Sequence, residues 1–223
     1  VGSNLYVADS DNNKIRKIVI ATGVVTTFAG SSSGFADNTT GTSAKFKRPY
    51  GITTDGTNLY VADNNNHAIR KIVIATGAVT TIAGTGSSGS ADNTTGTSAT
   101  FENPYGITTD GTNLYVTDTN NHTIRKIIIS TGVVSTLAGT GSEGYADDTG
   151  TSASFDQPRG ITTDGTNLYV VDTENHKIRK IVIATGVVTT LAGSGGGFIN
   201  STTGTSAKFR KPYGITSDGT NLY

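Results

Sequence analysis

The sequence predicts an all-β protein built from four copies of one antiparallel unit, and three observations support that prediction. First, Asn-Leu-Tyr recurs along the 223-residue chain, beginning at residues 4, 58, 113, 167 and 221, and a fixed period of this length indicates a repeat architecture. Second, each copy holds four short runs rich in β-branched residues, separated by turn residues. Third, no window places apolar residues at i, i+3, i+4 and i+7, so nothing indicates a helix.

The third copy shows the expected order of elements. Strands are predicted over Gly106–Thr109 and Leu114–Thr117, joined through Asp110-Gly111, a dipeptide typical of hairpins. Two more are predicted over Thr123–Ser130 and Val133–Leu137. Four such strands in a meander, repeated radially, are typical of a β-propeller blade.

A long connector follows the fourth strand of each copy, and it repeats an Ala-x-Phe pattern. Connectors of this length are usually functional or packed by their own side chains. We therefore expect the recurring apolar residues to be hydrophobic plugs over the blade junctions: Ala44/Phe46, Ala99/Phe101, Ala153/Phe155 and Ala207/Phe209. An Asp in three connectors (Asp37, Asp92 and Asp147) is expected to cap a turn rather than to bind Ca²⁺.

The two ends of the chain suggest how the propeller closes. The repeats run approximately over residues 1–47, 48–102, 103–156 and 157–211, within a single domain of residues 1–223. The first copy lacks its Gly-Ile-Thr-Thr strand, and a matching strand stands at Gly214–Ser217, inside a closing segment of residues 212–223. This predicts a four-bladed ring in which the C-terminal strand completes the N-terminal blade, because closure pairs exposed strand edges. An eight-bladed ring of two strand-exchanging chains, a homodimer, is the alternative.

One motif runs through all four copies: G-x-x-D…A-x-F-x-x-P-x-G-I-x-x-D-x-x-x-N-L-Y-V-x-D-x-x-N-H-x-I-R-K-I. It resembles the NHL repeat, and the resemblance covers essentially the whole chain. The resemblance implies a toroidal β-propeller. NHL propellers commonly have six blades, so four copies are a departure from the family pattern.

Composition narrows the classes of function. The chain has 17 basic and 17 acidic residues and a formal net charge of +0, so we expect neither nucleic acid nor an anionic membrane as a partner. It contains no Cys, which excludes disulfides and thiolate chemistry. A composition rich in Thr, Asn and Gly, without Cys, favours a bacterial secreted or cell-surface protein.

Two recurring polar patterns are expected to be architectural. His67, His122 and His176 occupy the same motif position on separate copies, whereas ligands of one zinc ion must converge on it. We therefore expect no metal and no cofactor. An Asp that ends the second strand and an Arg seven residues later should face each other across a hairpin: Asp9/Arg16, Asp63/Arg70, Asp118/Arg125 and Asp172/Arg179.

Positions where the copies disagree are the candidate functional sites. Immediately before the innermost strand stand Tyr50, Tyr105, Arg159 and Tyr213. This point is the mouth of a propeller's central channel, so the four residues predict an aromatic cup with a charged tip for a sugar or a peptide side chain. The alternative is that each Tyr only covers the neighbouring blade.

Charges near the same position segregate. Lys47, Arg48, Arg210 and Lys211 are basic, whereas Glu102 and Asp156 are acidic. In a closed ring the fourth and first connectors would be neighbours, which predicts a half-positive, half-negative face for a protein partner. The alternative is ordinary solvated loop charge.

These observations predict a non-enzymatic binding or scaffolding propeller, with a protein, peptide or glycan on the connector face and channel mouth. No unique acid, base or nucleophile stands out from the repeats, as an enzyme would require. There are two alternatives. One is an NHL-type propeller enzyme that acts as a metal-assisted lyase or hydrolase, and the other is a purely structural repeat array, either amplified or engineered.

Overall fold

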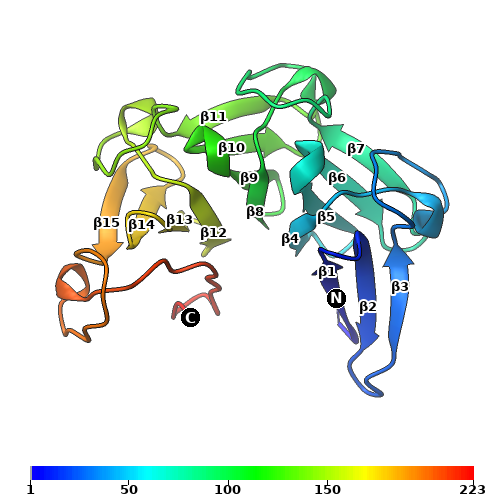
Figure 1. The fold of residues 1–223 in the computed structure, drawn as a ribbon, viewed down its shortest axis with the longest axis horizontal. Helices are drawn as coiled ribbons and strands as arrows, with labels where there is room; N and C mark the ends of the chain where they lie inside the picture. The colour runs from blue at the N-terminus through cyan, green and yellow to red at the C-terminus, as the bar shows by residue number, and fades with distance from the viewer. Residues whose placement is uncertain (1) are drawn as a thin grey trace.

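The structure, a computed structural model, describes residues 2–223 as four antiparallel β-sheets arranged in an open arc (Figure 1). We name these sheets blades I to IV. Blade I holds β1 (Asn4–Asp9), β2 (Lys14–Val19) and β3 (Val25–Ala29). Blade II holds β4 (Pro49–Thr54), β5 (Asn58–Asp63), β6 (Ala68–Val73) and β7 (Val79–Ala83). Blade III holds β8 (Pro104–Thr109), β9 (Asn113–Asp118), β10 (Thr123–Ile128) and β11 (Val134–Ala138), and blade IV holds β12 (Pro158–Thr163), β13 (Asn167–Asp172), β14 (Lys177–Val182) and β15 (Val188–Ala192).

The helical elements are single 3₁₀ turns. Four lie in the connectors: η1 (Gly41–Ser43), η3 (Gly96–Ser98), η5 (Gly150–Ser152) and η6 (Gly204–Ser206). The other two, η2 (Asn64–Asn66) and η4 (Thr119–Asn121), join the second and third strands of blades II and III. Within residues 2–223, no helix has the length and apolar character needed to cross a membrane.

The hairpin between the first two strands of each complete blade is held by its aspartate. In blade III the Asp110 carboxylate accepts the backbone N–H groups of Thr112 and Asn113 at 2.8 and 2.7 Å, and the Tyr115 hydroxyl at 2.8 Å. Burial raises the pKa of Asp110, but these hydrogen bonds, with that of the Asn113 side chain, outweigh burial and lower it. The predicted four-stranded antiparallel units are therefore confirmed, and the turn sets their register.

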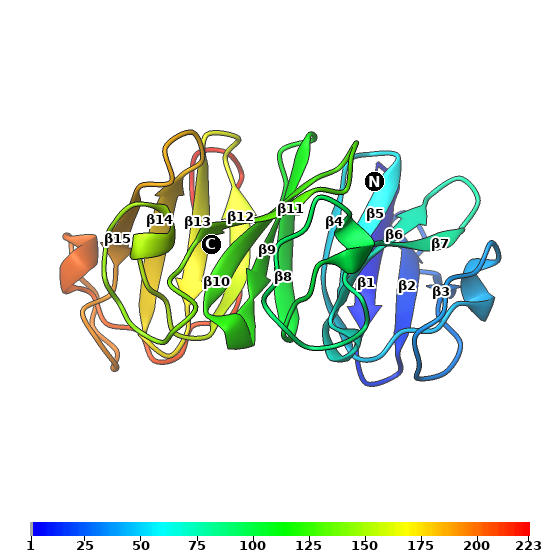
Figure 2. The same cartoon turned by 90° about the horizontal axis from the view of Figure 1, so that it is seen from above.

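The hydrophobic core lies between the blades rather than within them. Between blades III and IV, one buried cluster joins Ile124 of β10, Phe155 of the connector, and Leu168 and Val170 of β13. Figure 2 shows the sheets standing side by side with these connectors running across them. Phe46, Phe101 and Phe155 are fully buried, so the predicted plugs are confirmed at three junctions. The fourth, Phe209, is only partly buried.

Neighbouring innermost strands approach so closely that only glycine fits between them. A methyl group on Gly106 of β8 would overlap the carbonyl oxygen of Arg159 on β12, and Gly51 and Gly160 meet the same obstruction from Tyr105 and Tyr213. None of these three glycines has a positive φ, so backbone conformation is not the reason for glycine here. The recurring Pro-x-Gly sequence is therefore explained by the packing of one blade on the next.

The predicted closure of the ring is not formed. Blade I has three strands, and β1 has a strand partner on one side only, β2. The segment 212–223 instead lies beside β12, where Gly160 faces the backbone of Tyr213 and Ile215. It folds back on itself through two hydrogen bonds between Thr216 and Tyr223, at 2.9 and 3.0 Å. Figure 1 shows blades I and IV at opposite ends of the arc.

Candidate binding site on the inner rim

The four predicted ligand-binding residues form one contiguous row on the inner rim of the arc. Each lies between Pro and Gly: Tyr50, Tyr105 and Arg159 stand at the start of β4, β8 and β12, and Tyr213 holds the equivalent position in the C-terminal segment, which forms no strand. The rings of Tyr50 and Tyr105 stack with centroids 4.6 Å apart and planes 19° apart. The Arg159 guanidinium lies 5.4 Å from the Tyr105 ring and 4.8 Å from the Tyr213 ring. The structure thus brings the four together, although the rings cover each other's faces and form a column rather than an open cup.

A row of amide side chains lies beside this column. The Asn120 amide donates to Asn103 Oδ1 at 2.9 Å, and the Asn103 amide donates to Asn64 Oδ1 at 3.2 Å. Together they border a cavity of about 190 Å³ lined by Arg48, Tyr50, Asn64, Asn65, Asn103, Tyr105, Thr119, Asn120 and Arg159. Fixed amides supply both donors and acceptors, which suits a polar ligand with several hydroxyl or amide groups.

Arg159 is the only charged residue of the four-residue column, and it lacks the carboxylate partner that Arg16, Arg48, Arg70, Arg125 and Arg179 have. Its Nη2 donates to Gln157 Oε1 at 3.3 Å, and within residues 2–223 its buried Nε has no hydrogen-bond partner. No carboxylate within residues 2–223 forms an ion pair with it. The positive charge is held mainly by the faces of two tyrosine rings, an arrangement that leaves it uncompensated.

Sequence reasoning missed the amides, although a signal was present. The residue before each inner-strand proline differs between copies, as Arg48, Asn103, Gln157 and Lys211. All four have a positive φ, between 46° and 52°. The criterion that identified the tyrosines, disagreement between copies, applies equally one residue earlier.

The histidines bind the backbone of that preceding residue. Nδ1 of His67, His122 and His176 accepts the N–H of Asn103, Gln157 and Lys211 at 3.2, 3.2 and 3.1 Å. Asn13 takes this place in blade I, where its Oδ1 accepts the N–H of Arg48 at 2.9 Å. Each histidine is therefore an inter-blade hydrogen-bond acceptor. Burial lowers the pKa of His67, which favours the neutral ring that this bond requires.

The predicted half-positive, half-negative face is not formed, because the fourth and first connectors do not become neighbours in the open arc. Two of its basic residues are paired instead: Arg48 with Asp11 at 2.9 Å and Lys211 with Glu174 at 2.7 Å. Asp156 lies 3.5 Å from Nδ1 of His122.

The remaining residues of the predicted charged face are Lys47, Glu102 and Arg210, and they do not form a common surface charge pattern with the others. The backbone N–H groups of Lys47 and Glu102 donate to the aspartates that end β5 and β9, at 2.8 and 2.6 Å. Arg210 has an exposed side chain. Binding of a partner by these charges stays a prediction.

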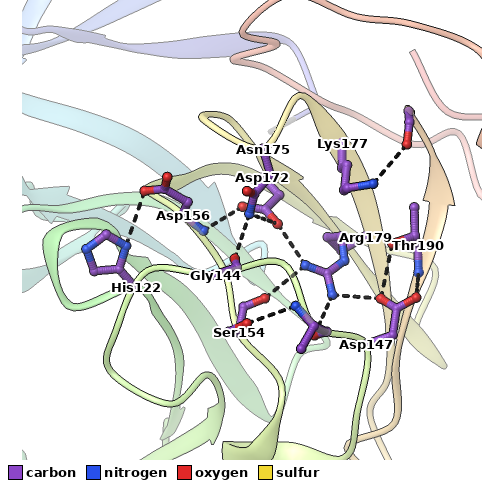
Figure 3. Close-up of polar contacts among 12 residues, drawn as sticks. His122, Gly144, Asp147, Ser154, Asp156, Asp172, Asn175, Lys177, Arg179 and Thr190 are labelled. Atoms are coloured by element: carbon purple, nitrogen blue, oxygen red, sulfur yellow. Dashed lines mark hydrogen bonds and ion pairs between the residues drawn. The ribbon is translucent and has the colours of Figure 1, made fainter. Parts of the chain in front are cut away.

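Below the rim, a buried arginine joins each complete blade to the connector before it, as Figure 3 shows for Arg179. Its guanidinium donates to Asp172 at 2.7 Å, to Asp147 at 2.7 Å and to the carbonyl of Ser154 at 2.9 Å, and lies 5.0 Å from the ring of Phe155. Arg179 and Asp172 are fully buried. We call this arrangement the arginine clamp.

The clamp confirms one prediction and corrects another. All four Asp–Arg pairs form, at 3.3 Å in blade I and 2.7–2.8 Å elsewhere. The prediction that the connector aspartates cap a turn within their own loop is wrong. Asp147 binds Arg179 and accepts the backbone N–H of Thr190 on β15 at 2.9 Å, so it links connector to blade. Long-range pairing of this kind has no signature in local spacing.

No family model matches the chain. Curated relatives do: the chain is 37% identical over 146 residues to human NHL repeat-containing protein 2, covering 60% of this chain and 20% of that protein. It is 30% identical over 202 residues to the Arabidopsis thaliana protein SUPPRESSOR OF QUENCHING 1, chloroplastic, covering 83% of this chain and 19% of that protein. The chain spans about a fifth of the length of the curated relatives it matches.

Solved structures with the same fold include a chain of a nidogen/laminin complex, with a TM-score of 0.68 and 21% identity over 100% of this chain and 67% of that one. An auxiliary nutrient binding protein of Bacteroides thetaiotaomicron gives 0.64 and 20%, over 98% and 62%. A virginiamycin B lyase of Staphylococcus aureus gives 0.56 and 17%, over 98% and 58%. A gluconolactonase of Xanthomonas campestris gives 0.64 and 14%, over 98% and 64%.

The blades and these folds define a protein of the β-propeller class. The repeat motif and the curated relatives identify the family within that class: the chain belongs to the NHL-repeat propellers.

Proposed function

We propose that the chain is a non-enzymatic binding or scaffolding propeller that holds its ligand or protein partner on the inner rim and the adjoining connector face. One observation carries the proposal. At the position where one repeat has Arg159 and three have Tyr, the side chains form one row, Tyr50–Tyr105–Arg159–Tyr213, beside a cavity lined with amides. Architecture has no need of such differences. An extracellular or cell-surface location is part of the proposal and rests on composition alone.

The chemistry of the rim indicates the class of ligand. The hydrogen-bonded amides and the tyrosine hydroxyls give several donors and acceptors, and Arg159 is the cation of this rim that has no ion pair within residues 2–223. A glycan, or a polar peptide with one acidic group, fits this set. The same fold holds binding proteins among its neighbours, including the nutrient binding protein, which supports this class of function by analogy.

A glycan and peptide binding screen tests the proposal, with the wild-type chain compared with a Tyr105→Ala/Arg159→Ala variant. We expect the variant to lose at least about tenfold in affinity for any ligand found, since each group contributes on the order of 1 kcal/mol or more. The matched control is Tyr145→Ala, which removes an exposed tyrosine on a connector away from the rim. Full affinity in the double variant would contradict a site on the inner rim.

A metal-assisted lyase or hydrolase is the alternative, and the lyase and the gluconolactonase among the structural neighbours are the reason to retain it. Within residues 2–223, no three His, Cys, Asp or Glu side chains are grouped as metal ligands. The three histidines lie on separate blades and bind backbone N–H groups. Binding therefore ranks first. Metal-dependent turnover of a lactone substrate would reverse that order.

A further inference from the structure

The cavity beside the tyrosine column has a charge that the chain as a whole lacks. The 17 basic and 17 acidic residues of the chain balance, but Arg48 and Arg159 line this cavity and no Asp or Glu of residues 2–223 does. Arg48 is paired with Asp11 at 2.9 Å, whereas Arg159 has no ion pair within the described part of the chain. A ligand in the cavity therefore meets one uncompensated cation and no carboxylate that would repel an anion.

The Arg159 guanidinium retains donors for a ligand. It lies 5.4 and 4.8 Å from the rings of Tyr105 and Tyr213. Its Nη2 donates to Gln157 at 3.3 Å, and its Nη1 forms no hydrogen bond within residues 2–223. A guanidinium is a planar fork whose parallel N–H groups match the two oxygens of a carboxylate. The remaining donors of Arg159 therefore favour a carboxylate over a neutral acceptor.

A side chain of the neighbouring blade fixes the backbone of Arg159. Thr117 of β9 is fully buried, and its hydroxyl accepts the N–H of Gly106 at 2.7 Å and donates to the carbonyl of Arg159 at 2.7 Å. Thr119 donates to the carbonyl of Pro158 at 2.7 Å. Two successive carbonyls at the start of β12 are thus held from blade III, which sets the position of the Arg159 backbone at the rim.

Thr117 and Arg159 are both departures from the repeat, and they are in contact. Where Thr117 stands in blade III, the other blades have Ala8, Ala62 and Val171, none of which has a hydroxyl. Where Arg159 stands, the other repeats have tyrosine. At the other junctions within residues 2–223, a side chain holds the proline carbonyl alone. The extra backbone anchor therefore occurs at the one position where the column carries a charge.

The amide row leaves one donor and one acceptor open. Asn103, in its middle, accepts from Asn120 at 2.9 Å and donates to Asn64 at 3.2 Å. Oδ1 of Asn120 and the amide nitrogen of Asn65 form no hydrogen bond within residues 2–223, and both residues line the cavity. A sugar hydroxyl both donates and accepts, so two neighbouring hydroxyls match this open acceptor and open donor.

The size and lining of the cavity favour a sugar over a peptide. Its volume of about 190 Å³ is below the roughly 300–1,000 Å³ of pockets that enclose drug-sized ligands, so it suits a single unit of a longer chain. No Val, Leu or Ile of residues 2–223 lines it, whereas peptide recognition often relies on apolar anchors. An Asp or Glu side chain would satisfy Arg159 but bring no hydroxyl for the amides. A uronic acid carries a carboxylate and neighbouring hydroxyls on one ring.

We propose that this cavity is a subsite for a uronic acid unit of an acidic glycan, with the carboxylate on Arg159 and hydroxyls on the amides of Asn65 and Asn120. Thr117 is a positioning residue, which holds Arg159 in place without touching the ligand. The inference rests on the function proposed above and specifies the ligand of that site.

Calorimetric titration with tetrasaccharides of galacturonate and of glucuronate tests the proposal, each as the free acid and as the full methyl ester. The ester keeps the hydroxyls but removes the charge. Wild type should bind at least one acid about 10- to 100-fold more tightly than its ester, because hydrogen bonds to charged groups are the stronger ones. Added NaCl should reduce this preference.

Arg159→Tyr restores the residue of the other three repeats, so the blade should fold, and this variant should bind acid and ester equally. The matched control is Arg210→Tyr, which removes the same charge at an exposed side chain that does not line the cavity. The control should keep the wild-type preference for the acid.

The outcomes separate this inference from the function on which it rests. Equal binding of acid and ester by wild type would overturn carboxylate recognition, and binding of neither form would overturn the uronic acid assignment. An acidic peptide that binds wild type but not Arg159→Tyr, while no uronate binds, would also overturn the assignment but would support a binding site on the rim.

Thr117→Val tests the positioning role, because valine is the residue at this position in blade IV. The variant should lose several-fold in affinity for the acid and keep its affinity for the ester, and Thr117→Ser, which retains a hydroxyl, should restore the preference. An unchanged preference in Thr117→Val, or an equal loss for acid and ester, would contradict a role through Arg159.

Discussion

Blade III and blade I carry the same Asp–Arg motif in different surroundings. In blade III, Arg125 lies 2.8 Å from Asp118, and both side chains are 0% exposed. In blade I, Arg16 lies 3.3 Å from Asp9, and the side chains are 31% and 27% exposed. The hairpins themselves match, since β9 with β10 and β1 with β2 pair in the same register.

The difference comes from the preceding connector. Arg125 also donates to the carbonyls of Thr100 and Ala91 and to Asp92, and it lies 4.9 Å from the Phe101 ring. No connector precedes blade I within the described residues 2–223. The hairpin therefore forms the pair, and the neighbouring repeat buries it. Stability in this fold is located mainly between repeats, as in other repeat proteins.

The largest effect is expected from Arg125→Met. It leaves Asp118 buried without its cation and should cost about 3–5 kcal/mol in the free energy of unfolding. Arg16→Met removes the same pair at a partly exposed site and should cost about 0–1 kcal/mol. Urea denaturation of both variants, at concentrations where the chain is monomeric, measures the contrast. Equal losses would show that the connector does not decide the value of the pair.

A smaller effect is expected where inner strands touch. Gly106→Ala places a methyl group against the carbonyl of Arg159 and should cost about 1–3 kcal/mol, the usual range for overpacking. Gly214→Ala is the matched control, because a methyl group there meets no atom within 4 Å. Thermal unfolding of the two variants sharpens the comparison between an occupied and an open junction. A Gly214→Ala variant destabilised as much as Gly106→Ala would contradict the assignment of the cost to the carbonyl of Arg159.

The smallest effect concerns pH and compares His67 with Asn13, which fills the same position in blade I. Burial holds the pKa of His67 in the folded state below its usual value, so the unfolded chain binds more protons just below pH 6.5. The neutral His67 ring therefore contributes to the free energy of unfolding above pH 6.5, and this contribution is lost as the pH falls through the folded-state pKa. His67→Asn keeps an acceptor but removes the titration, so the wild type should lose more stability than the variant on acidification from pH 7 to pH 5.

Much of the local structure could be predicted because it depends on neighbours in sequence. The strands of blade III, the turn at Asp110 and the pairing of Asp118 with Arg125 all lie within one meander, where alternation and turn chemistry set the register. The alignment of Tyr50 with Tyr105 also followed from the repeat period, since equivalent positions of successive blades must be adjacent.

The errors concern contacts between repeats. Asp147 was assigned to its own loop, but it reaches Arg179 across 32 residues. The tyrosines were expected to present a cup, but whether rings face a channel or each other depends on the distance between blades. The amide of Asn103 was missed for the same reason, because its partners Asn64 and Asn120 come from two different blades.

The sequence by itself determined the blade: its strands, its turns and the composition of its two faces, because period, alternation and turn residues are read over tens of residues. Only the tertiary structure showed whether the four blades close into a ring. The arrangement of the blades depends on the packing at each junction, where Phe101 and Phe155 are buried between neighbouring blades, and the four blades form an open arc. That packing is a sum over many van der Waals contacts between side chains distant in sequence, and no single residue encodes it.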